Sequence, residues 1–271
     1  MGIMTRGVSY ICISLVGATE RRELMSKQFE KYNLNASFFD GIEVRDHSFD
    51  VSAAEVSDRM RRYGRLLSNG EIGCYLSHRQ VWKQLLHSDD IALCVMEDDI
   101  SLRPGFQSAI DELIAHLDHW DVVRLMGLNR RERIVYADLP SGTQLMWMDR
   151  QPVGTQCYVI SRTGAAALLK HTAHIVHAID TAIDRHWEHK LRLFVTEPEY
   201  VSTVDMGSTV GVRPGITSIS MRVKEKVFRR IDKLAAARYN AKYRPRQVIN
   251  LGGERPYVET SGPFPSASKL A

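Results

Sequence analysis

The uninterrupted apolar run at residues 91–96 (IALCVM) constrains the fold of this chain more than any other feature. A strand with one face in water alternates apolar and polar side chains, whereas a strand buried on both faces is apolar throughout. The run ends at three consecutive acidic residues, Glu97, Asp98 and Asp99. In open α/β sheets, ligands bind at the edge formed by the carboxyl ends of the strands. The sequence therefore predicts a central buried strand with a polar site at its end.

Short apolar runs alternate with helix-like patterns along the rest of the chain, which is typical of an α/β fold. Ser68 followed by Glu71 matches a capping box at the start of a helix, and Thr19 is the expected N-cap of an earlier one. Residues 127–150 are polar and irregular, which is compatible with a hairpin. Strands are expected at residues 8–16, 38–39, 91–96, 121–126, 155–160 and 191–196, the last being the final core strand, and helices at 19–32, 68–86, 104–117 and 163–171.

Charge is unevenly distributed over the 271 residues. The chain has 36 Lys and Arg against 32 Asp and Glu, a formal net charge of +4, yet residues 222–246 alone hold ten basic and two acidic residues. The rest of the chain therefore sums to −4, which argues against a main domain that binds nucleic acid. We expect one domain at residues 1–215 and a basic helical extension at 216–271, with an unstructured tail from residue 261.

Cysteine spacing and hydropathy predict the compartment. No run of about 18 apolar residues suggests a membrane-spanning helix, and the N-terminal residues lack the pattern of a signal peptide. The four cysteines are far apart and form no CxxC pair, so neither a zinc site nor a redox motif is expected. Together these features predict a reduced, cytoplasmic protein.

Residues 222–246 also have the pattern of an amphipathic helix. Val227, Ile231, Leu234 and Ala235 form an apolar stripe. The basic residues at the other positions are Lys224, Lys226, Arg229, Arg230, Lys233 and Arg238. Such a helix can lie on an anionic membrane surface, or it can pack on the domain with its basic face in water. The pattern leaves both open, and we favour the membrane.

The acidic triplet is the main candidate for metal binding. Adjacent carboxylates repel one another unless a cation or water compensates their charge. Hard cations such as Mn²⁺ or Mg²⁺ take oxygen ligands. In an extended segment Glu97 and Asp99 would point to one side and Asp98 to the other. The alternative is a solvated acidic turn.

Two more carboxylates, Asp180 and Asp184, lie four residues apart in the segment HAIDTAIDRHWEH. One is a candidate general base, and the other is a candidate partner of Arg185; both could instead be cap or surface charges. The histidines of this region match no zinc motif, and the chain contains neither GxxxxGK[ST] nor GxGxxG. A P-loop NTPase or a dinucleotide enzyme is therefore not supported.

Arginines and a histidine complete the candidate site. Arg21 and Arg22 could bind phosphate through charge-assisted hydrogen bonds, although such pairs are also common on solvated helix faces. His78 lies in the helix that follows the capping box, where it is either functional or a core histidine whose hydrogen bonds are satisfied. Glu71 has the alternative role of capping-box partner.

Taken in order, these pieces resemble glycosyltransferase family 25, which includes bacterial lipooligosaccharide galactosyltransferases and the related collagen galactosyltransferases. The matching pieces span roughly residues 8–210 and are ISLVGATERRELM, FFDGIEV, LSNGEIGCYLSHRQVWKQLL, ALCVMEDDI, GTQCYVISRTGAAALL and HAIDTAID. The chain departs from the family after the first strand, where Ser14-Leu15 replaces the usual Asn-Leu and Val16-Gly17 replaces the usual basic residues.

The resemblance implies a GT-A-type α/β fold, a Rossmann-like mixed sheet flanked by helices. It implies a UDP-sugar donor, UDP-galactose first and UDP-glucose second, a Mn²⁺ or Mg²⁺ cofactor and inversion at the anomeric carbon. Glu97 and Asp99 would hold the metal, and Asp180, with Asp184 in reserve, would be the base. The residues implied at the donor site are Ser14, Leu15, Arg21, Arg22, Glu71, Cys74, Ser77, His78 and Asp98.

The implied acceptor is a glycan, such as lipooligosaccharide or another cell-surface glycolipid, reached from the cytoplasmic side with the basic helix on the inner membrane. No nucleic-acid partner is expected. Two competing hypotheses are a catalytically degenerate domain that binds nucleotide sugars and docks to membranes, and a metal-dependent phosphate-ester hydrolase. The hydrolase is disfavoured because only one acidic cluster follows a clear strand and no nucleophile motif accompanies it.

Overall fold

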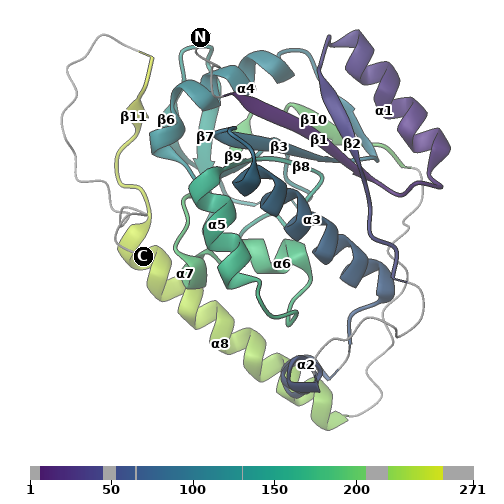
Figure 1. Ribbon diagram of the computed structural model, residues 1–271. Coiled ribbons are helices and arrows are strands. Elements are labelled where there is room, and N and C mark those ends of the chain that lie inside the picture. Colours follow the sequence, from purple (N-terminus) through teal and green to yellow (C-terminus); the bar gives the residue numbers. More distant parts are fainter. Residues whose placement is uncertain (1–6, 45–52, 65, 130, 206–218, 253–271) are drawn as a thin grey trace.

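The computed structural model describes residues 7–44, 53–64, 66–129, 131–205 and 219–252, and their core is a large mixed sheet flanked by helices (Figure 1). The described strands are β1 (Val8–Ser14), β2 (Ala36–Asp40), β3 (Ala92–Glu97), β4 (Ile100–Leu102), β5 (Val122–Arg124), β6 (Ile134–Asp138), β7 (Gln144–Trp147), β8 (Cys157–Ser161), β9 (Leu193–Glu197), β10 (Val201–Thr203) and β11 (Ile249–Asn250). The helices are α1 (Thr19–Lys31), α2 (Ala53–Tyr63), α3 (Asn69–His87), α4 (Phe106–Ala115), the 3₁₀ turn η2 (Leu117–His119), α5 (Arg162–His171), α6 (Ile179–Asp184), α7 (His186–His189) and α8 (Ile219–Tyr243). The predicted fold class, a mixed sheet flanked by helices, is confirmed.

The strand order of the large sheet is β11-β6-β7-β9-β5-β8-β3-β1-β2. β1 pairs in parallel with both β2 and β3, whereas β8 runs antiparallel to its neighbours β3 and β5. Consecutive parallel strands of the Rossmann-like kind thus occur on the β2-β1-β3 side, and two further parallel pairs are β5-β9 and β11-β6. β4 and β10 form a separate two-stranded antiparallel sheet.

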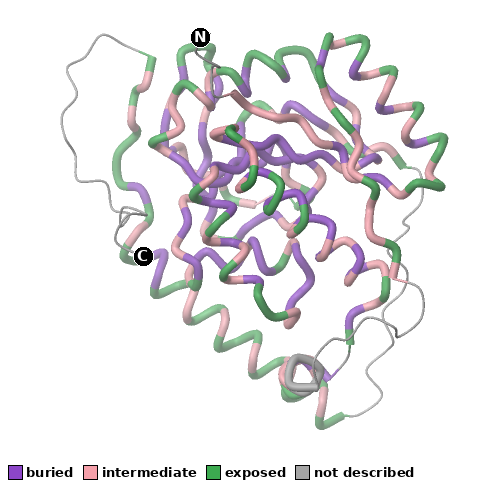
Figure 2. The backbone as a smooth tube through the Cα atoms, viewed as in Figure 1, coloured by how far each residue is buried: buried purple, intermediate pink, exposed green. Residues whose placement is uncertain are grey.

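β3 is the central buried strand that the apolar run predicts. Its residues from Ala92 to Met96 are all buried, and only Glu97 at its end is partly exposed. Leu93 and Val95 pack in a core cluster with side chains of α3, α5 and α6, whereas Cys94 and Met96 pack with side chains of α1 and α4. Figure 2 shows this buried interior in purple, whereas α8 at the outside of the domain is largely exposed or half-buried.

The capping box at the start of α3 is confirmed. The Ser68 Oγ accepts a hydrogen bond from the Glu71 N–H, and the Glu71 carboxylate accepts one from the Ser68 N–H. The predicted N-cap of α1 is wrong, because Ala18 occupies that position without a side-chain hydrogen bond and Thr19 is already helical.

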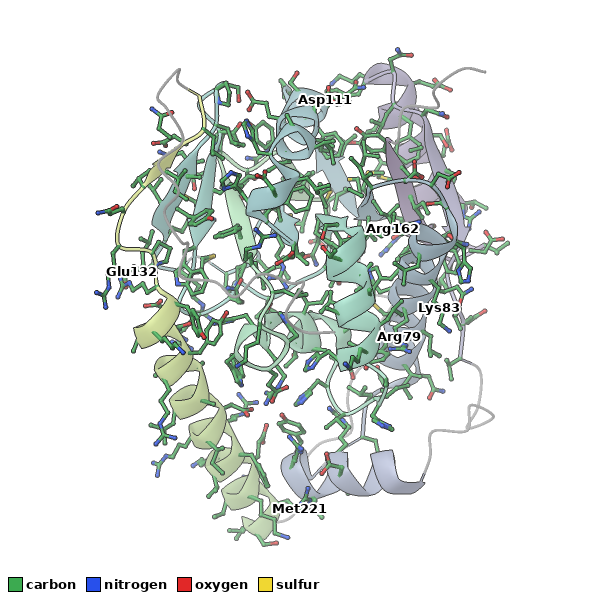
Figure 3. The ribbon with its side chains drawn as sticks, turned by 60° about the vertical axis from the view of Figure 1, so that its left-hand side comes forward. Arg79, Lys83, Asp111, Glu132, Arg162 and Met221 are labelled. Carbon is green, nitrogen blue, oxygen red and sulfur yellow. The ribbon has the colours of Figure 1, made fainter. Side chains whose placement is uncertain are left out.

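Three arginine contacts then fix α3 against α5. Arg79 Nη1 donates to the Leu169 carbonyl at 2.9 Å. Arg162 donates to the carbonyls of Leu85 and Ser88 at the other end of α3. Figure 3 labels both arginines on these two helices.

Two other strand predictions need correction. The first strand ends at Ser14, two residues early, because the chain turns at Leu15, whose carbonyl accepts from the Ala18 N–H at 3.0 Å. β9 is not the final strand of the sheet, since β11 joins it in parallel beside β6. β11 has two residues and so shows no hydropathy pattern of its own. The hairpin expected within residues 127–150 is confirmed as β6 and β7.

α8 packs on the domain through one face and exposes the other. Arg185 holds Asp232 with hydrogen bonds of 2.7 and 2.8 Å, and the Asn240 side chain bonds His186 Nε2 at 2.9 Å. At the far end, Gly64 lies so close to Met221 that a Cβ there would meet the Met221 Cβ at 2.6 Å; Figure 3 labels Met221 beside α2. None of the helices in the described residues combines the length and apolar content needed to cross a membrane.

The exposed face of α8 carries the predicted apolar stripe. The side chains exposed there are Ile219, Val223, Val227, Ile231 and Leu234, with exposed fractions from 48% to 80%. These positions fall on the helix face opposite Asp232 and Tyr239, because successive residues are about 100° apart. The sequence left open whether this helix lies on a membrane or packs on the domain. The structure shows α8 packed on the domain, but none of the described residues covers its apolar stripe.

Candidate active site

The candidate site lies at the carboxyl edge of the parallel strands. β1, β2 and β3 end there at Ser14, Asp40 and Glu97. β8 runs the other way, so the residues just before it reach the same edge, and the Glu97 N–H donates to the Gln156 carbonyl at 2.8 Å. The first turns of α3 also lie there, because the Ile42 N–H after β2 donates to the Ser77 Oγ at 2.8 Å.

Asp98 is held by two of the predicted donor-site residues. Its carboxylate accepts from the Ser14 Oγ at 2.6 Å and from Arg21 Nη1 at 2.8 Å, and the side chains of Arg21 and Asp98 are only 10% and 11% exposed. The expectation of an extended triplet is wrong, because Asp98 and Asp99 form a tight turn between β3 and β4. That turn directs Asp98 toward α1, so its charge is compensated by Arg21.

Arg22 supports the turn that follows β1. Its Nη2 donates to the Ser14 carbonyl at 2.8 Å and to Asp40 Oδ1 at 2.6 Å, while its Nε donates to the Leu15 carbonyl at 3.1 Å. The structure thus places Arg21 and Arg22 on different partners. Contact of either with a donor phosphate stays a prediction.

Glu97 faces α3 and β8. Its Oε1 accepts a hydrogen bond from the Thr155 Oγ1 and lies 3.6 Å from His78 Nε2. Burial raises the pKa of Glu97, but the nearby His78 and the Thr155 hydroxyl outweigh it and hold that pKa below its ordinary value. Cys74 lies beside them, so that one ligand atom from each of Cys74, His78 and Glu97 is within 4.8 Å of the other two.

Because the chain has no CxxC pair, the sequence predicted no zinc site. The structure nevertheless brings together three side chains that could hold a metal ion, Cys74, His78 and Glu97. Cys74 and His78 come from one helix and Glu97 from a strand, so no spacing motif could detect them. All four cysteines are free in the structure. Burial raises the pKa of the Cys74 thiol well above its ordinary value.

His78 is a fully buried residue that is fixed by two aromatic side chains. Its Nδ1 lies 2.9 Å from the Tyr158 hydroxyl, which also accepts a hydrogen bond from Trp82 Nε1 at 2.8 Å. Tyr158, Trp82 and Thr155 were not among the predicted site residues. The sequence alone hardly identifies them as site residues, because that requires knowing that β8 lies antiparallel beside β3.

Asp99 is the acidic residue of the triplet that lacks a compensating partner. Its Oδ1 is buried and has no hydrogen-bond partner among the described residues. Burial, followed by the neighbouring charge of Glu97, raises the pKa of Asp99 to about 6. A carboxylate in this position is stabilised by a cation, so the site fits the hard divalent ion that the triplet predicts.

The two carboxylates of α6 occupy different environments. Asp184 is buried and accepts from Arg124 Nη2 at 2.5 Å, while burial raises the pKa of Asp184 to about 6. Asp180 accepts only local hydrogen bonds in the described residues, from the backbone and side chain of Thr181. After the larger effect of burial, the charges of Glu97 and then Asp180 also raise the pKa of the Cys74 thiol. The predicted partner Arg185 is wrong, since it pairs with Glu188 and Asp232.

The remaining predicted donor-site residues on α3 have structural contacts. Glu71 closes the capping box, and the Ser77 hydroxyl donates to the Gly73 carbonyl at 2.7 Å. Gly73 allows the segment after β2 to approach, because a Cβ there would lie 2.2 Å from the Ile42 carbonyl oxygen. A role of Glu71 or Ser77 in donor binding stays a prediction.

The sequence was compared with family models and with curated proteins. The sequence model described as "Glycosyltransferase family 25 (LPS biosynthesis protein)" matches residues 8–183. Probable inactive glycosyltransferase 25 family member 3 of Bos taurus is 27% identical over 171 residues, which cover 58% of this chain and 28% of that protein. Procollagen galactosyltransferase 1-A of Xenopus laevis is 25% identical over 167 residues, covering 58% and 27%. The chain thus spans less than a third of the length of these curated relatives.

Solved structures are similar only at low scores. A glycosyltransferase involved in the glycosylation of the major capsid of PBCV-1 aligns with a TM-score of 0.36 at 7% identity, covering 83% of this chain and 99% of that one. The protein A197 from STIV aligns with a TM-score of 0.40 at 11% identity, covering 77% and 98%.

Proposed function

Since the chain belongs to glycosyltransferase family 25, whose sequence model matches residues 8–183, we propose that it transfers a hexose from a UDP-sugar to a glycan acceptor with inversion at the anomeric carbon. The proposed donor is UDP-galactose, with UDP-glucose second. The name of the Xenopus laevis relative, a procollagen galactosyltransferase, supports galactose. The family description, an LPS biosynthesis protein, supports a lipooligosaccharide or another glycolipid as acceptor.

The observation that carries the proposal is the uncompensated carboxylate of Asp99 beside Glu97. Asp98 is neutralised by Arg21, whereas the buried Asp99 Oδ1 has no partner among the described residues. Asp99 and Glu97 are therefore the groups that would hold Mn²⁺ or Mg²⁺ against a diphosphate at this edge. When bound, such an ion neutralises the negative charge that develops on the UDP leaving group.

Asp180 is the proposed general base. An inverting transfer forms the bond between the acceptor oxygen and the anomeric carbon as the bond to UDP breaks, and the acceptor hydroxyl loses its proton to a carboxylate. Asp184 is less suited to this role, because it is engaged with Arg124 at 2.5 Å. Asp180 is bonded only to its neighbour Thr181 in the described residues, so its second carboxylate oxygen is the better acceptor for a proton.

The test is UDP release from a panel of UDP-sugars with a glycan acceptor, with Mn²⁺ or with a chelator. We expect release from one hexose donor, dependent on the ion, and a fall of about 100-fold or more in Asp99→Asn, because several kcal/mol of charge stabilisation are lost. Asp89→Asn is the matched control, because it makes the same charge change at an exposed residue eight positions before Glu97 and outside the site.

Failure of the transferase would point to the alternative, a degenerate domain that binds nucleotide sugars. The printed name of the Bos taurus relative, probable inactive, favours keeping that alternative. Thermal stabilisation by UDP with Mn²⁺, without release from any donor and acceptor pair, would support it. Phosphate release without sugar transfer would instead favour a hydrolase.

We further propose that α8 docks the enzyme on an anionic membrane surface, where a glycolipid acceptor would be presented. The exposed stripe of α8 is apolar, and basic side chains flank it on both sides along the helix. Helices of this kind bind the interface through apolar burial plus attraction to anionic lipids. Asp232 and Asn240 hold the opposite face of α8 against the domain, so the stripe points outward.

Neutralising the basic residues of α8 is expected to weaken vesicle binding. The triple variant Arg229→Gln, Arg230→Gln and Lys233→Gln removes three charges worth about 1 kcal/mol each near an anionic surface. We expect roughly 100-fold weaker binding to phosphatidylserine vesicles in a sedimentation assay, with UDP release in solution unchanged. Lys27→Gln, Lys83→Gln and Arg103→Gln, which change the net charge equally on other exposed elements, should bind like wild type. Equal binding by both triple variants would contradict docking through α8.

A further inference from the structure

Cys74, His78 and Glu97 form a group of potential metal ligands between α3 and the end of β3. One ligand atom of each lies within 4.8 Å of the other two. Cys74 and His78 are four residues apart and so share one face of α3, while Glu97 is the last residue of β3. We propose that these three side chains form a binding site for a thiophilic divalent ion such as Zn²⁺, which adjoins the proposed hard-cation site and shares Glu97 with it.

The strongest support comes from His78. Its Nε2 is buried and has no hydrogen-bond partner among the described residues. The nearest acidic atom, Glu97 Oε1, is 3.6 Å away, which is too far for a hydrogen bond but suited to an ion between them. Leaving such a buried polar atom unsatisfied is costly, so a ligand for Nε2 would stabilise this part of the fold.

The second nitrogen of His78 has the partner that a metal-bound histidine needs. Ligating histidines almost always donate their other ring N–H to a fixed acceptor, which sets the tautomer. His78 Nδ1 lies 2.9 Å from the Tyr158 hydroxyl. A phenol oxygen has lone pairs for two donors, so it can accept from both His78 Nδ1 and Trp82 Nε1, which is 2.8 Å away.

The donor set selects the ion. A thiolate, an imidazole and a carboxylate suit Zn²⁺, whereas Mg²⁺ and Mn²⁺ prefer oxygen ligands. Ligand atoms around one Zn²⁺ lie about 3.5 Å apart. His78 Nε2 and Glu97 Oε1 are already 3.6 Å apart, and the Cys74 Sγ lies within 4.8 Å of both, so a small movement of the thiol completes the set. Cys74 and Glu97 are each partly exposed, which leaves them free to rotate and gives the ion access. Three protein ligands leave the fourth tetrahedral position for water or a substrate oxygen.

The position of Glu97 gives the site a consequence for catalysis. A Zn²⁺ ion held here would occupy Glu97 Oε1 and compete with its use in the hard-cation site, so Zn²⁺ should inhibit transfer. This consequence rests on the proposed function. The binding of Zn²⁺ does not, and it is tested without any enzymatic assay.

The test is a Co²⁺ titration of the reduced, metal-free full chain, followed by absorbance. We expect one Co²⁺ per chain, with tetrahedral ligand-field bands and a thiolate-to-cobalt charge-transfer band that Zn²⁺ removes and excess Mg²⁺ does not. Cys74→Ser should lose the charge-transfer band, and the control Cys94→Ala should keep it. Tyr158→Phe should bind 10- to 100-fold more weakly, the usual effect of losing the partner of a ligating histidine.

Two further results separate this site from its neighbours. Asp99→Asn should lose Mn²⁺-dependent transfer yet keep the Co²⁺ spectrum, and a lost spectrum would place the ion at the triplet instead. In the unaltered chain, Zn²⁺ should protect Cys74 from alkylation by iodoacetamide, as read by mass spectrometry. Equal labelling with and without Zn²⁺, absence of the charge-transfer band, its persistence in Cys74→Ser, or its displacement by Mg²⁺ would each overturn the proposal.

Discussion

Replacing Asp180 by Asn is expected to lower kcat by roughly 10²- to 10⁴-fold, the usual contribution of a general base. The amide has the shape of the carboxylate but cannot take the proton of the acceptor hydroxyl. The donor KM and the melting temperature should stay close to wild type, because the hydrogen bonds of the Asp180 carboxylate in the described residues come only from Thr181. Steady-state kinetics with the donor found in the UDP-release panel give kcat and KM separately.

Asp184→Asn is the matched comparison for this result, because it makes the same change one helical turn away. It removes the anionic partner of Arg124, so its main effect should be on stability. If Asp184→Asn instead lowers kcat at unchanged melting temperature while Asp180→Asn remains active, the two roles are exchanged. If neither variant affects kcat, the base lies outside α6.

Asp184→Ala is expected to lower the free energy of unfolding by about 3–5 kcal/mol, because it leaves the Arg124 charge buried without a partner. The Arg124 and Asp184 side chains are 2% and 13% exposed, and their nitrogen and oxygen are 2.5 Å apart. Arg124 Nε also donates to the Gly154 carbonyl at 3.0 Å. The pair therefore holds the segment that precedes β8 and carries Thr155 to Glu97.

Urea unfolding measures this difference, and two variants serve as controls. Arg229→Gln breaks the exposed pair with Glu225 on α8 and should cost less than about 1 kcal/mol. The double variant Arg124→Met with Asp184→Leu removes both charges and should recover part of the loss, since an apolar pair leaves no buried charge. A loss below 1 kcal/mol for Asp184→Ala would show that water reaches the Arg124 guanidinium.

The features that sequence could predict are those set by local pattern. The apolar run ending at Glu97 identified β3 because burial on both faces leaves no polar position. Ser68 and Glu71 identified the start of α3 because a capping box is a bond between residues three apart. The stripe of α8 followed from helical periodicity, although whether another element covers it is decided by tertiary packing.

The features that sequence missed depend on strand order. The pairing of Asp98 with Arg21 on α1 was not predicted, because it depends on a turn directly after β3 and on how α1 packs beside that turn. Thr155 and Tyr158 were not predicted, since nothing local shows that β8 pairs antiparallel with β3. Arg124 looks like a polar interruption of a strand, yet it is the buried partner of Asp184. Each of these pairings joins elements that are distant in the sequence, and the hydropathy pattern does not show which elements lie side by side in the fold.

The contacts that define the site are also distant along the chain, and this bears on how the protein folds. Arg21 reaches Asp98 across 77 residues, His78 reaches Tyr158 across 80, and Thr155 reaches Glu97 across 58. Closing such loops costs entropy before the contacts form, and chains rich in distant contacts fold slowly. β8 must insert between β3 and β5 before any partner from its strand reaches the edge. We therefore expect the polar groups of the site to come together only once the central strands have paired.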